Sequence, residues 1–372
     1  MINPTTPILS NPEEYLRYRE NERVNFCVID PTVDNRWDNF VAGQEDGSIF
    51  HTAAWARTIR EAYGYDPRYY VLEDNNGMLK AGMPLYQIKS ALTGNRLVCL
   101  PFSDICLPLG EEADIGLLIE RAKQDIEDGA ASYLEIRGLP GSISPAQLGL
   151  ESHDYHLLYV LDLETDTNAV QKRFHNSIRR GIRQAEKRGV VVRMTDDESD
   201  LKRFYKLHIS TRKKLGVLPQ PGSFFKALYR NVISKGLGFT GLAEADGRVI
   251  AGIVFLQYGD TVYYKFNASD ERYLQKRPNH LVTWEGINYA CAQKYRYFDF
   301  GRCSPDEEGL RTYKTRWGAG EIKLPYFYFP RVKGITSVAE NSTRYKIMRL
   351  FSHLAPQCVF EAAGSLLYRH FG

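Results

Sequence analysis

The feature that most constrains the fold is an order of elements that occurs twice along the chain. Apolar periodicity and turn residues predict, in each half, helix followed by a hairpin, a strand, another helix and a last strand. In the first half these elements fall at residues 49–63, 69–88, 96–100, 113–127 and 132–138. In the second half, which opens with two helices, they fall at residues 204–215, 223–234, 239–256, 261–269, 280–294 and 297–301. Such repetition indicates two copies of one unit.

Individual residues support this duplication. The first hairpin, LEDNNGMLKAG at residues 72–82, aligns with LAEADGRVIAG at residues 242–252, so glycines match at the turn and again five residues later. The strand SYLEIRG aligns with RYFDFGR, which places Glu135 opposite Asp299. Helices alternating with strands and hairpins predict mixed sheets. We therefore predict an α/β (α+β) protein of two tandem mixed-sheet domains related by internal duplication.

The repeat also suggests domain boundaries. A lead at residues 1–22 precedes a first domain at 23–160, a second at 161–330 and a basic helical tail at 331–372. With 372 residues, of which 43% are hydrophobic, the chain is long enough to fill two cores. The lead lacks the apolar core of a signal peptide, and no apolar run approaches the ~20 residues that span a bilayer.

Cysteine usage and charge narrow the class of protein further. The six cysteines are dispersed without a C-x-x-C pair or clustered histidines, so neither a zinc site nor a disulfide framework is predicted, and a reducing cytoplasm fits. A helix is predicted at residues 167–188, and residues 171–189 carry seven basic residues against one acid. Such a surface suits an anionic partner such as RNA, a diphosphate or a membrane headgroup, with a solvated face as the alternative. Lys172 and Arg173 are the candidate binding residues.

The tail after residue 330 is basic as well, with six basic residues against two acids. It reads as helical, with one apolar stripe formed by Ile347, Leu350, Phe351 and Leu354. This stripe predicts docking on the body of the protein, or peripheral contact with a bilayer surface at the inner face of the membrane.

A short aromatic strand leads directly into a helix at residues 297–317, YFDFGRCSPDEEGLRTYKTRW. The residues at 304–307 form a capping box with proline at the first helical position, so the helix is expected to begin there. On this helix Leu310, Tyr313 and Trp317 form an apolar stripe, and Lys314 lies at its edge. Either its stem packs while its ammonium reaches water, or the charge points into a cleft where an oxyanion develops.

Two motifs carry a resemblance to a known family. RRGIRQAEKRGV at residues 179–190 precedes the second copy, and GLRTYKTRWGA at residues 309–319 follows a D-F-G-R strand. Over roughly residues 24–330, the chain resembles the Fem-type transferases of peptidoglycan bridge synthesis and related proteins of GNAT-type fold. The resemblance implies a pair of GNAT-like domains with a substrate groove between or along them.

The resemblance also implies an activity. Fem-type enzymes transfer an aminoacyl group from charged tRNA to an amine on a lipid-linked peptidoglycan precursor. Their G-L-x-x-[FY]-K pattern places an aromatic residue and a lysine near the tRNA acceptor end and the reacting carbonyl, and it maps here onto Gly309, Leu310, Tyr313 and Lys314. Two departures stand out: the helical coiled arm of some members is not visible, and similar sequences are linked with exopolysaccharide and surface-protein sorting, so the acceptor is left open.

Acyl transfer to an amine needs a neutral nucleophile, stabilisation of the oxyanion and a route for the proton. We expect Lys314 to stabilise the oxyanion and Tyr313 to contact the donor, with Trp317 and Arg302 nearby as further substrate contacts. Asp299 and His208 are candidates for the proton route. His208 faces inward on its helix, so a satisfied core histidine is its alternative role. The alternative for Asp299 is a carboxylate that caps or pairs with Arg302. The reaction can also proceed without a protein base. Cys303 is expected to be a passive small residue because no histidine pairs with it.

The helix after the strand TVYYKFNAS begins near Asn279 and His280, and backbone amides at such a helix start can accept a phosphate. A plain N-cap is the alternative role for Asn279. The glycine-rich [QR]-x-x-G-x-[GA] loop of acetyl-CoA users is missing from SDERYLQKRPNHL. We therefore expect no metal and no tightly bound cofactor, with aminoacyl-tRNA or acyl-CoA as the donor. An acyl-CoA-dependent N-acetyltransferase, and a non-catalytic protein that binds RNA or anionic lipid, remain the alternative functions.

Overall fold

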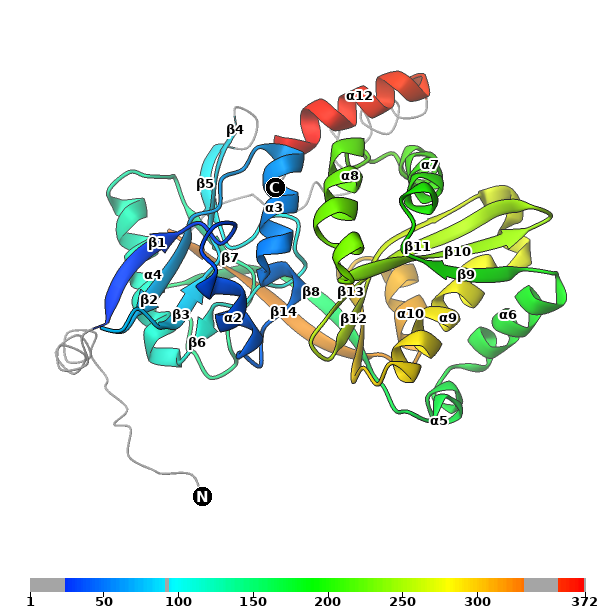
Figure 1. The fold of residues 1–372 in the computed structure, drawn as a ribbon, viewed down its shortest axis with the longest axis horizontal. Helices are drawn as coiled ribbons and strands as arrows, with labels where there is room; N and C mark the ends of the chain where they lie inside the picture. The colour runs from blue at the N-terminus through cyan, green and yellow to red at the C-terminus, as the bar shows by residue number, and fades with distance from the viewer. Residues whose placement is uncertain (1–23, 91–93, 331–353, 371–372) are drawn as a thin grey trace.

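The computed structural model describes residues 24–90, 94–330 and 354–370, and places two mixed α/β lobes side by side (Figure 1). The first lobe is built from β1 (Asn25–Ile29), α2 (Arg36–Ala42), η1 (Ile49–His51), α3 (Ala53–Tyr63), β2 (Tyr69–Glu73), β3 (Leu79–Met83), β4 (Tyr86–Ser90), β5 (Gly94–Val98), β6 (Leu109–Gly110), α4 (Glu112–Glu127), β7 (Leu134–Ile136) and β8 (Glu151–Asp162).

The second lobe follows with α5 (Thr167–Lys172), α6 (Asn176–Lys187), β9 (Val191–Thr195), α7 (Glu198–Leu215), α8 (Gly222–Asn231), η2 (Ile233–Lys235), β10 (Gly238–Ala245), β11 (Arg248–Tyr258), β12 (Thr261–Ser269), η3 (Glu271–Lys276), α9 (Pro278–Ala292), β13 (Tyr297–Cys303), α10 (Glu308–Arg316) and β14 (Gly320–Phe329). At the C-terminal end, α12 (Gln357–Leu367) lies over α7 and α8, and η4 (Tyr368–His370) contacts β4 of the first lobe (Figure 1).

The strands that follow the two copies join the lobes. One sheet has the order β1-β2-β3-β6, and a ten-stranded sheet has the order β4-β5-β7-β14-β8-β13-β12-β11-β10-β9. β8, which follows the first copy, pairs with β13 of the second, whereas β14, which follows the second copy, pairs with β7 of the first. β8 and β14 also pair with each other. The exchanged strands make one continuous sheet across both lobes.

Each lobe contains one short parallel strand pair, and these pairs confirm the predicted correspondence of Glu135 and Asp299. β5 and β7 end their parallel register at Val98 opposite Glu135. β12 and β13 end theirs at Tyr263 opposite Asp299. The two carboxyl groups therefore occupy the same position in the two copies, at the point where the parallel strands part.

The matched hairpin glycines also have matched roles. A Cβ on Gly82 would lie 2.4 Å from a ring carbon of Trp37 on α2, and one on Gly252 would lie 3.0 Å from a ring carbon of Phe204 on α7. In both copies the first helix therefore packs directly onto glycine backbone of the hairpin. This common packing confirms the predicted tandem α/β architecture at the level of side chains.

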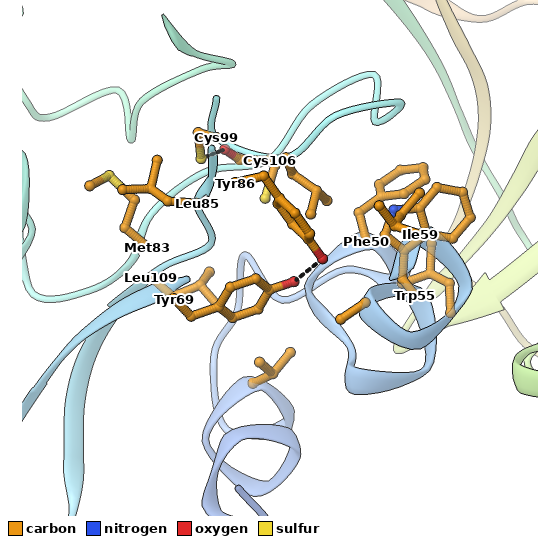
Figure 2. Close-up of a cluster of buried hydrophobic side chains, with 14 of the residues drawn as sticks. Phe50, Trp55, Ile59, Tyr69, Met83, Leu85, Tyr86, Cys99, Cys106 and Leu109 are labelled. Atoms are coloured by element: carbon orange, nitrogen blue, oxygen red, sulfur yellow. Dashed lines mark hydrogen bonds between the residues drawn. The ribbon is translucent and has the colours of Figure 1, made fainter. Parts of the chain in front are cut away.

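Apolar side chains fill both lobes. Figure 2 shows part of the first-lobe core, where the hydroxyl oxygens of Tyr69 and Tyr86 lie 3.5 Å apart among buried aliphatic and thiol groups. This core continues into the second lobe because α3 packs against α8, with the rings of Trp55 and Phe224 at a centroid distance of 6.1 Å. A separate cluster fills the other face of the second-lobe sheet beneath α6 and α9.

Two predicted elements differ in the structure, and one helix was not predicted. The strand expected at residues 78–88 is divided into β3 and β4, since Pro84 lacks the amide that a continuing ladder needs. The basic helix at residues 167–188 breaks into α5 and α6, because Phe174 turns inward against Trp317, 5.0 Å between ring centroids, and His175 caps α6. The short helix α2 was not predicted.

The helix at the capping box is also shorter than expected. The Glu307 carboxylate accepts the Ser304 amide at 2.7 Å, as a capping box requires, but α10 begins only at Glu308. Leu310 is 40% exposed, so the predicted stripe was wrong at this position, and the buried face of α10 consists of Lys314 with the adjoining Trp317. The tail stripe lies outside the described residues except for Leu354, which is exposed. Within the described ranges, no helix combines the length and apolarity needed to cross a bilayer.

We predict that Gly82→Ala destabilises the first lobe by about 1–3 kcal/mol, because its methyl group would overlap the fully buried ring of Trp37. Urea unfolding measures the difference. Gly141→Ala is the matched control, since a Cβ there meets nothing within 4 Å. Equal unfolding free energies for the two variants would contradict the proposed close packing of α2.

Candidate functional site

The candidate site begins with a bulge in β13. Asp299 pairs with Val160 and Arg302 with Leu158, so Phe300 and Gly301 lie opposite a single residue of β8. Gly301 has a φ of 72°, and a Cβ there would lie 3.3 Å from the Asp104 carboxylate. Glycine is therefore required both by the backbone conformation and by the neighbouring carboxylate.

This bulge holds the ammonium of Lys314. Its Nζ donates to the carbonyl oxygens of Gly301 at 2.8 Å and Arg302 at 3.0 Å, and it lies 5.4 Å from the ring centroid of Tyr159. The residue is only 4% exposed, so its head does not reach bulk water. Burial lowers the pKa of the ammonium, while the Cys303 thiol and the carboxyls of Asp104 and Asp299 oppose that shift. Two of the three N–H donors are used, which leaves one.

Asp104 brings the first lobe to the same place. It lies between β5 and β6, and its carboxylate contacts Lys265 of β12 at 3.1 Å and Arg302 at 3.5 Å. Its backbone carbonyl accepts the Tyr326 hydroxyl at 2.7 Å. Burial raises the pKa of the Asp104 carboxyl, but the cations of Lys265 and Arg302 outweigh burial, and the pKa lies below its ordinary value. The site is therefore built by both lobes.

The pKa of the Asp299 carboxyl is shifted in the opposite direction, above its ordinary value. Its Oδ1 accepts the Gly301 amide at 2.6 Å, and the residue is buried. Burial and the nearby Asp104 carboxylate raise the pKa of Asp299 from 3.8 to about 7, against the opposing effects of the Gly301 amide and the cations of Lys314 and Lys265. One carboxyl of the site is thus ionised and the other titrates near neutrality, a separation typical of acid–base chemistry.

Arg302 connects the bulge to the central strands. Its guanidinium donates to Nε2 of His156 on β8 at 2.6 Å and lies over the ring of Tyr326 on β14, 5.3 Å from the centroid. Burial and the Arg302 cation lower the pKa of His156 to about 4, so this imidazole accepts as a neutral ring. Arg302 contacts Asp104 and does not pair with Asp299, which rules out the ion pair considered as an alternative role for Asp299.

Other predicted residues lie beside this cluster, in the packing between α9 and α10. The Tyr313 hydroxyl lies 3.2 Å from Oγ1 of Thr283, and Trp317 is fully buried. The ring of His280 packs against α6, because a Cβ on Gly181 would lie 2.3 Å from it. These three aromatic rings support the helix that carries Lys314.

His208 and Asn279 lie apart from the bulge. His208 is 2% exposed among aromatic rings of α7 and α8, with Nε2 2.7 Å from Oε1 of Gln220, and burial lowers its pKa to about 3. It is a core histidine, which was the alternative interpretation of its inward-facing position. Asn279 is the second residue of α9, and its amide donates to the Ser269 hydroxyl at 3.4 Å. The N-cap position belongs to Arg277.

The predicted basic surface is present on α5 and α6. Lys172 is exposed, and Arg180, Arg183 and Lys187 extend the cationic face along α6. Arg173 has local partners, since it donates to the Asp162 carbonyl at 2.5 Å and lies 3.6 Å from the Glu164 carboxylate. Lys172 is therefore better placed than Arg173 to meet an external anion.

Sequence reasoning missed Asp104 and Lys265. Asp104 follows a predicted strand in the loop PFSDICLPLG, and Lys265 lies mid-strand in TVYYKFNAS. A charged residue in the centre of an otherwise apolar strand was the available signal for Lys265. Nothing in the spacing of the loop indicated that Asp104 reaches the other lobe.

Comparison with known proteins identifies the class. Residues 172–315, from the end of α5 to α10 with Lys314 included, match the family model described as an acetyltransferase (GNAT) domain. The second lobe therefore corresponds to the GNAT domain of this family model, and the chain has the fold of a tandem GNAT protein. No curated protein sequence matches the chain.

Solved structures agree on the fold at low identity. FemX superposes with a TM-score of 0.65 at 17% identity, over 82% of this chain and 97% of FemX. A tandem GNAT protein from the clavulanic acid biosynthesis pathway superposes with a TM-score of 0.53 at 10% identity, over 82% of this chain and 98% of that chain. L-PGS from Bacillus licheniformis superposes with a TM-score of 0.54 at 13% identity, over 87% of this chain and 97% of that chain. The predicted resemblance to Fem-type and GNAT proteins is confirmed at this level.

The raised pKa of Asp299 predicts a pH-dependent stability. Between about pH 4 and 7 the carboxyl ionises in the unfolded chain before it ionises in the native protein, so the unfolding free energy falls as pH rises. The expected slope is roughly 1.4 kcal/mol for each pH unit. Urea unfolding of Asp299→Asn beside the wild type measures it, because the variant lacks this titration. Identical pH dependence in both proteins would contradict the raised pKa.

Proposed function

We propose that the protein is an N-acyltransferase of Fem/GNAT type, which transfers an aminoacyl or acyl group to an amine on a cell-envelope or exopolysaccharide-related precursor. The observation that carries the proposal is the ammonium of Lys314, held by two backbone carbonyls beside a carboxyl that titrates near neutrality. The GNAT family match over residues 172–315 supports the reaction class.

Lys314 is assigned to the oxyanion. When an amine attacks the donor carbonyl, negative charge develops on the carbonyl oxygen, and a preorganised cation stabilises that charge. The carbonyls of Gly301 and Arg302 fix the position of the ammonium before substrate arrives, and its remaining N–H is free to donate. Burial strengthens the interaction, because the surrounding dielectric is low.

Asp299 is assigned to the proton. The attacking ammonium must become a neutral amine, and a carboxyl whose pKa is about 7 is suited to accept a proton at neutral pH. Arg302 of β13 pairs with Asp104 of the first lobe, so this charged pair joins the two lobes beside the proposed reaction site. Tyr313 and Trp317 position α10, and His280 supports them from α9.

An aminoacyl-tRNA is the first donor to test. The rings of Tyr264 and Phe300, 5.8 Å between centroids, follow directly after the last paired residues of β12 and β13 and pack in the core beside them. The exposed cations of α5 and α6 suit RNA. An acyl-CoA donor remains the second variant, favoured by the description of the matching family as acetyltransferases. No tightly bound cofactor or metal is assigned.

A cytoplasmic protein working at the inner face of the membrane would meet such precursors. The basic tail at residues 331–372 carries six basic residues against two acids, which supports peripheral contact with anionic lipid. The same cationic surfaces favour one function of another class, a non-catalytic protein that binds RNA or anionic lipid. The two functions differ in whether Lys314 affects turnover.

We predict that Lys314→Met lowers kcat/KM for transfer by about 10²–10³-fold, because a neutral side chain cannot stabilise the oxyanion. The assay offers labelled aminoacyl-tRNA and acetyl-CoA separately, each with an amine-bearing precursor. The variant also leaves two buried carbonyls without a donor, so a loss of about 1–3 kcal/mol in stability is expected. Activity is therefore compared at a temperature where both proteins are folded.

Lys226→Met is the matched control, since Lys226 is an exposed lysine on α8. Transfer at the normal rate by Lys314→Met would remove the assigned mechanism. Absence of transfer from either donor in the wild type, together with retained RNA or lipid binding, would favour the binding protein.

The cationic face predicts a second effect, on donor affinity. Replacing Lys172 and Arg183 by alanine is expected to weaken tRNA binding, because fewer phosphates are neutralised. The dependence of log affinity on log salt should fall by roughly 0.7–0.9 for each phosphate that the variant no longer neutralises. Binding titrations between roughly 50 and 200 mM salt measure the slope. An unchanged slope would show that tRNA does not meet α5 and α6.

A further inference from the structure

A separate groove lies on the other side of the second-lobe sheet. One face of α7, the start of β11 and the beginning of η3 enclose about 550 Å³. It is lined by Arg203, Lys206, Leu207, Ser210, Thr211, Lys214, Arg248, Val249, Ser269, Asp270, Glu271 and Arg272. Positions 203, 206, 207, 210, 211 and 214 are spaced to share one face of α7, so this helix presents a row of cations and hydroxyls to the groove.

Most of the lining charges already have partners. Lys214 pairs with Glu271 at 2.6 Å, Arg272 with Asp270 at 2.6 Å, and Arg203 with Glu244 at 3.0 Å. These pairs place the acids of η3 against the outer cations. The walls of the groove are therefore held in position by ion pairs and do not need a ligand to neutralise them.

Two cations in the groove make no ion pair within 4 Å among the described residues. Lys206 on α7 is exposed, and Arg248 at the start of β11 contacts the Tyr273 hydroxyl at 3.5 Å. After the hydrogen bonds from Arg272, the charge of Arg248 also helps to lower the pKa of Asp270. Leu207 and Val249 add apolar surface to the lining, and the exposed Ser210 adds a hydroxyl. Two cations beside apolar surface suit a ligand that carries a phosphate next to a flat or apolar group. A nucleotide has both.

The groove is connected to the basic helix through η3. The Lys276 ammonium donates to the Arg188 carbonyl at the end of α6 at 3.3 Å, and it pairs with Asp246 at 3.2 Å. Ser269 lines the groove and also contacts Asn279 at the start of α9. These contacts connect residues beside the groove to the end of α6 and the start of α9.

This site is distinct from the Lys314 cluster. The residues Leu201 and Phe204 of α7 pack in the core on one face of the sheet, whereas Tyr313 and Trp317 of α10 pack in the core on the other face. Figure 1 shows α7 on one side of β10–β11 and α9 with α6 on the opposite side. Variants of the groove therefore do not alter the bulge that holds Lys314.

We propose that the groove is a second anion site, which binds a nucleotide phosphate between Lys206 and Arg248. The phosphate ester can come from a strand of RNA or from a soluble nucleotide such as coenzyme A, and both sources present the same group to the same cations. The proposal does not require the transfer reaction, because it concerns binding alone.

The test is a binding titration with three proteins and two probes. The probes are a fluorescent single-stranded RNA of twelve nucleotides and coenzyme A. The double variant Lys206→Ala/Arg248→Ala is expected to bind the recognised probe at least tenfold more weakly than the wild type, whereas the exposed-lysine control Lys226→Ala is expected to bind it normally. If RNA is the source, the slope of log affinity against log salt is expected to fall by roughly 1.4 in the double variant. Each of the two lost phosphate contacts accounts for about 0.7 with a single strand.

A second variant tests the position of the phosphate. Ser210→Glu places a carboxylate on the exposed face of α7 without touching the core, and it is expected to weaken binding of the same probe by repulsion. Unchanged affinity for both probes in the double variant and in Ser210→Glu would overturn the proposal, even if transfer activity were demonstrated.

Discussion

The structure around the candidate site depends on one buried cation. Isolated from water, the ammonium of Lys314 would be strongly unfavourable, and the bulge of β13 reduces this penalty by turning two consecutive carbonyls toward it. The bulge in turn depends on Gly301, whose left-handed conformation and missing side chain leave room for Asp104. Strand, helix and first-lobe loop are therefore tied together by a single charged group.

Duplication alone would produce two lobes with no shared site. The exchange of β8 and β14 brings the end of each copy into the sheet of the other, so His156 and Tyr326 reach Arg302 from the two central strands. The loop that carries Asp104 then completes the cluster from the first lobe. The equivalent position of the first copy differs, because Glu135 pairs with Arg137 at 2.8 Å where Asp299 accepts a backbone amide. Burial and the Asp104 carboxylate raise the pKa of Asp299 to about 7.

Local patterns predicted much of this fold. The glycines at 77, 82, 247 and 252 marked both hairpins, because a positive φ at the turn and a close helix above the strand each leave a signal in the sequence. The short helix α2 left a weaker signal, since seven residues scarcely show a helical period. Strand exchange and the approach of Asp104 are tertiary contacts between segments far apart in the chain, and no local spacing encodes them.

The burial of Lys314 was predicted only in part. Its place beside an apolar stripe indicated an inward-facing charge, but both sequence interpretations assumed that the ammonium meets water or substrate. Backbone carbonyls took that role because the bulge could not be seen in the sequence. For the same reason Tyr313 and Trp317, expected to meet the substrate, are used chiefly to hold α10 against α9.

The most direct measurement is a crystal structure with a phosphonate analogue of the tetrahedral intermediate, formed between an aminoacyl or acyl group and an amine. The account predicts that a phosphonate oxygen lies within about 3 Å of the Lys314 ammonium, which keeps its bonds to Gly301 and Arg302. A phosphonate bound elsewhere, with its oxygens facing other donors and Lys314 still enclosed by backbone alone, would contradict it.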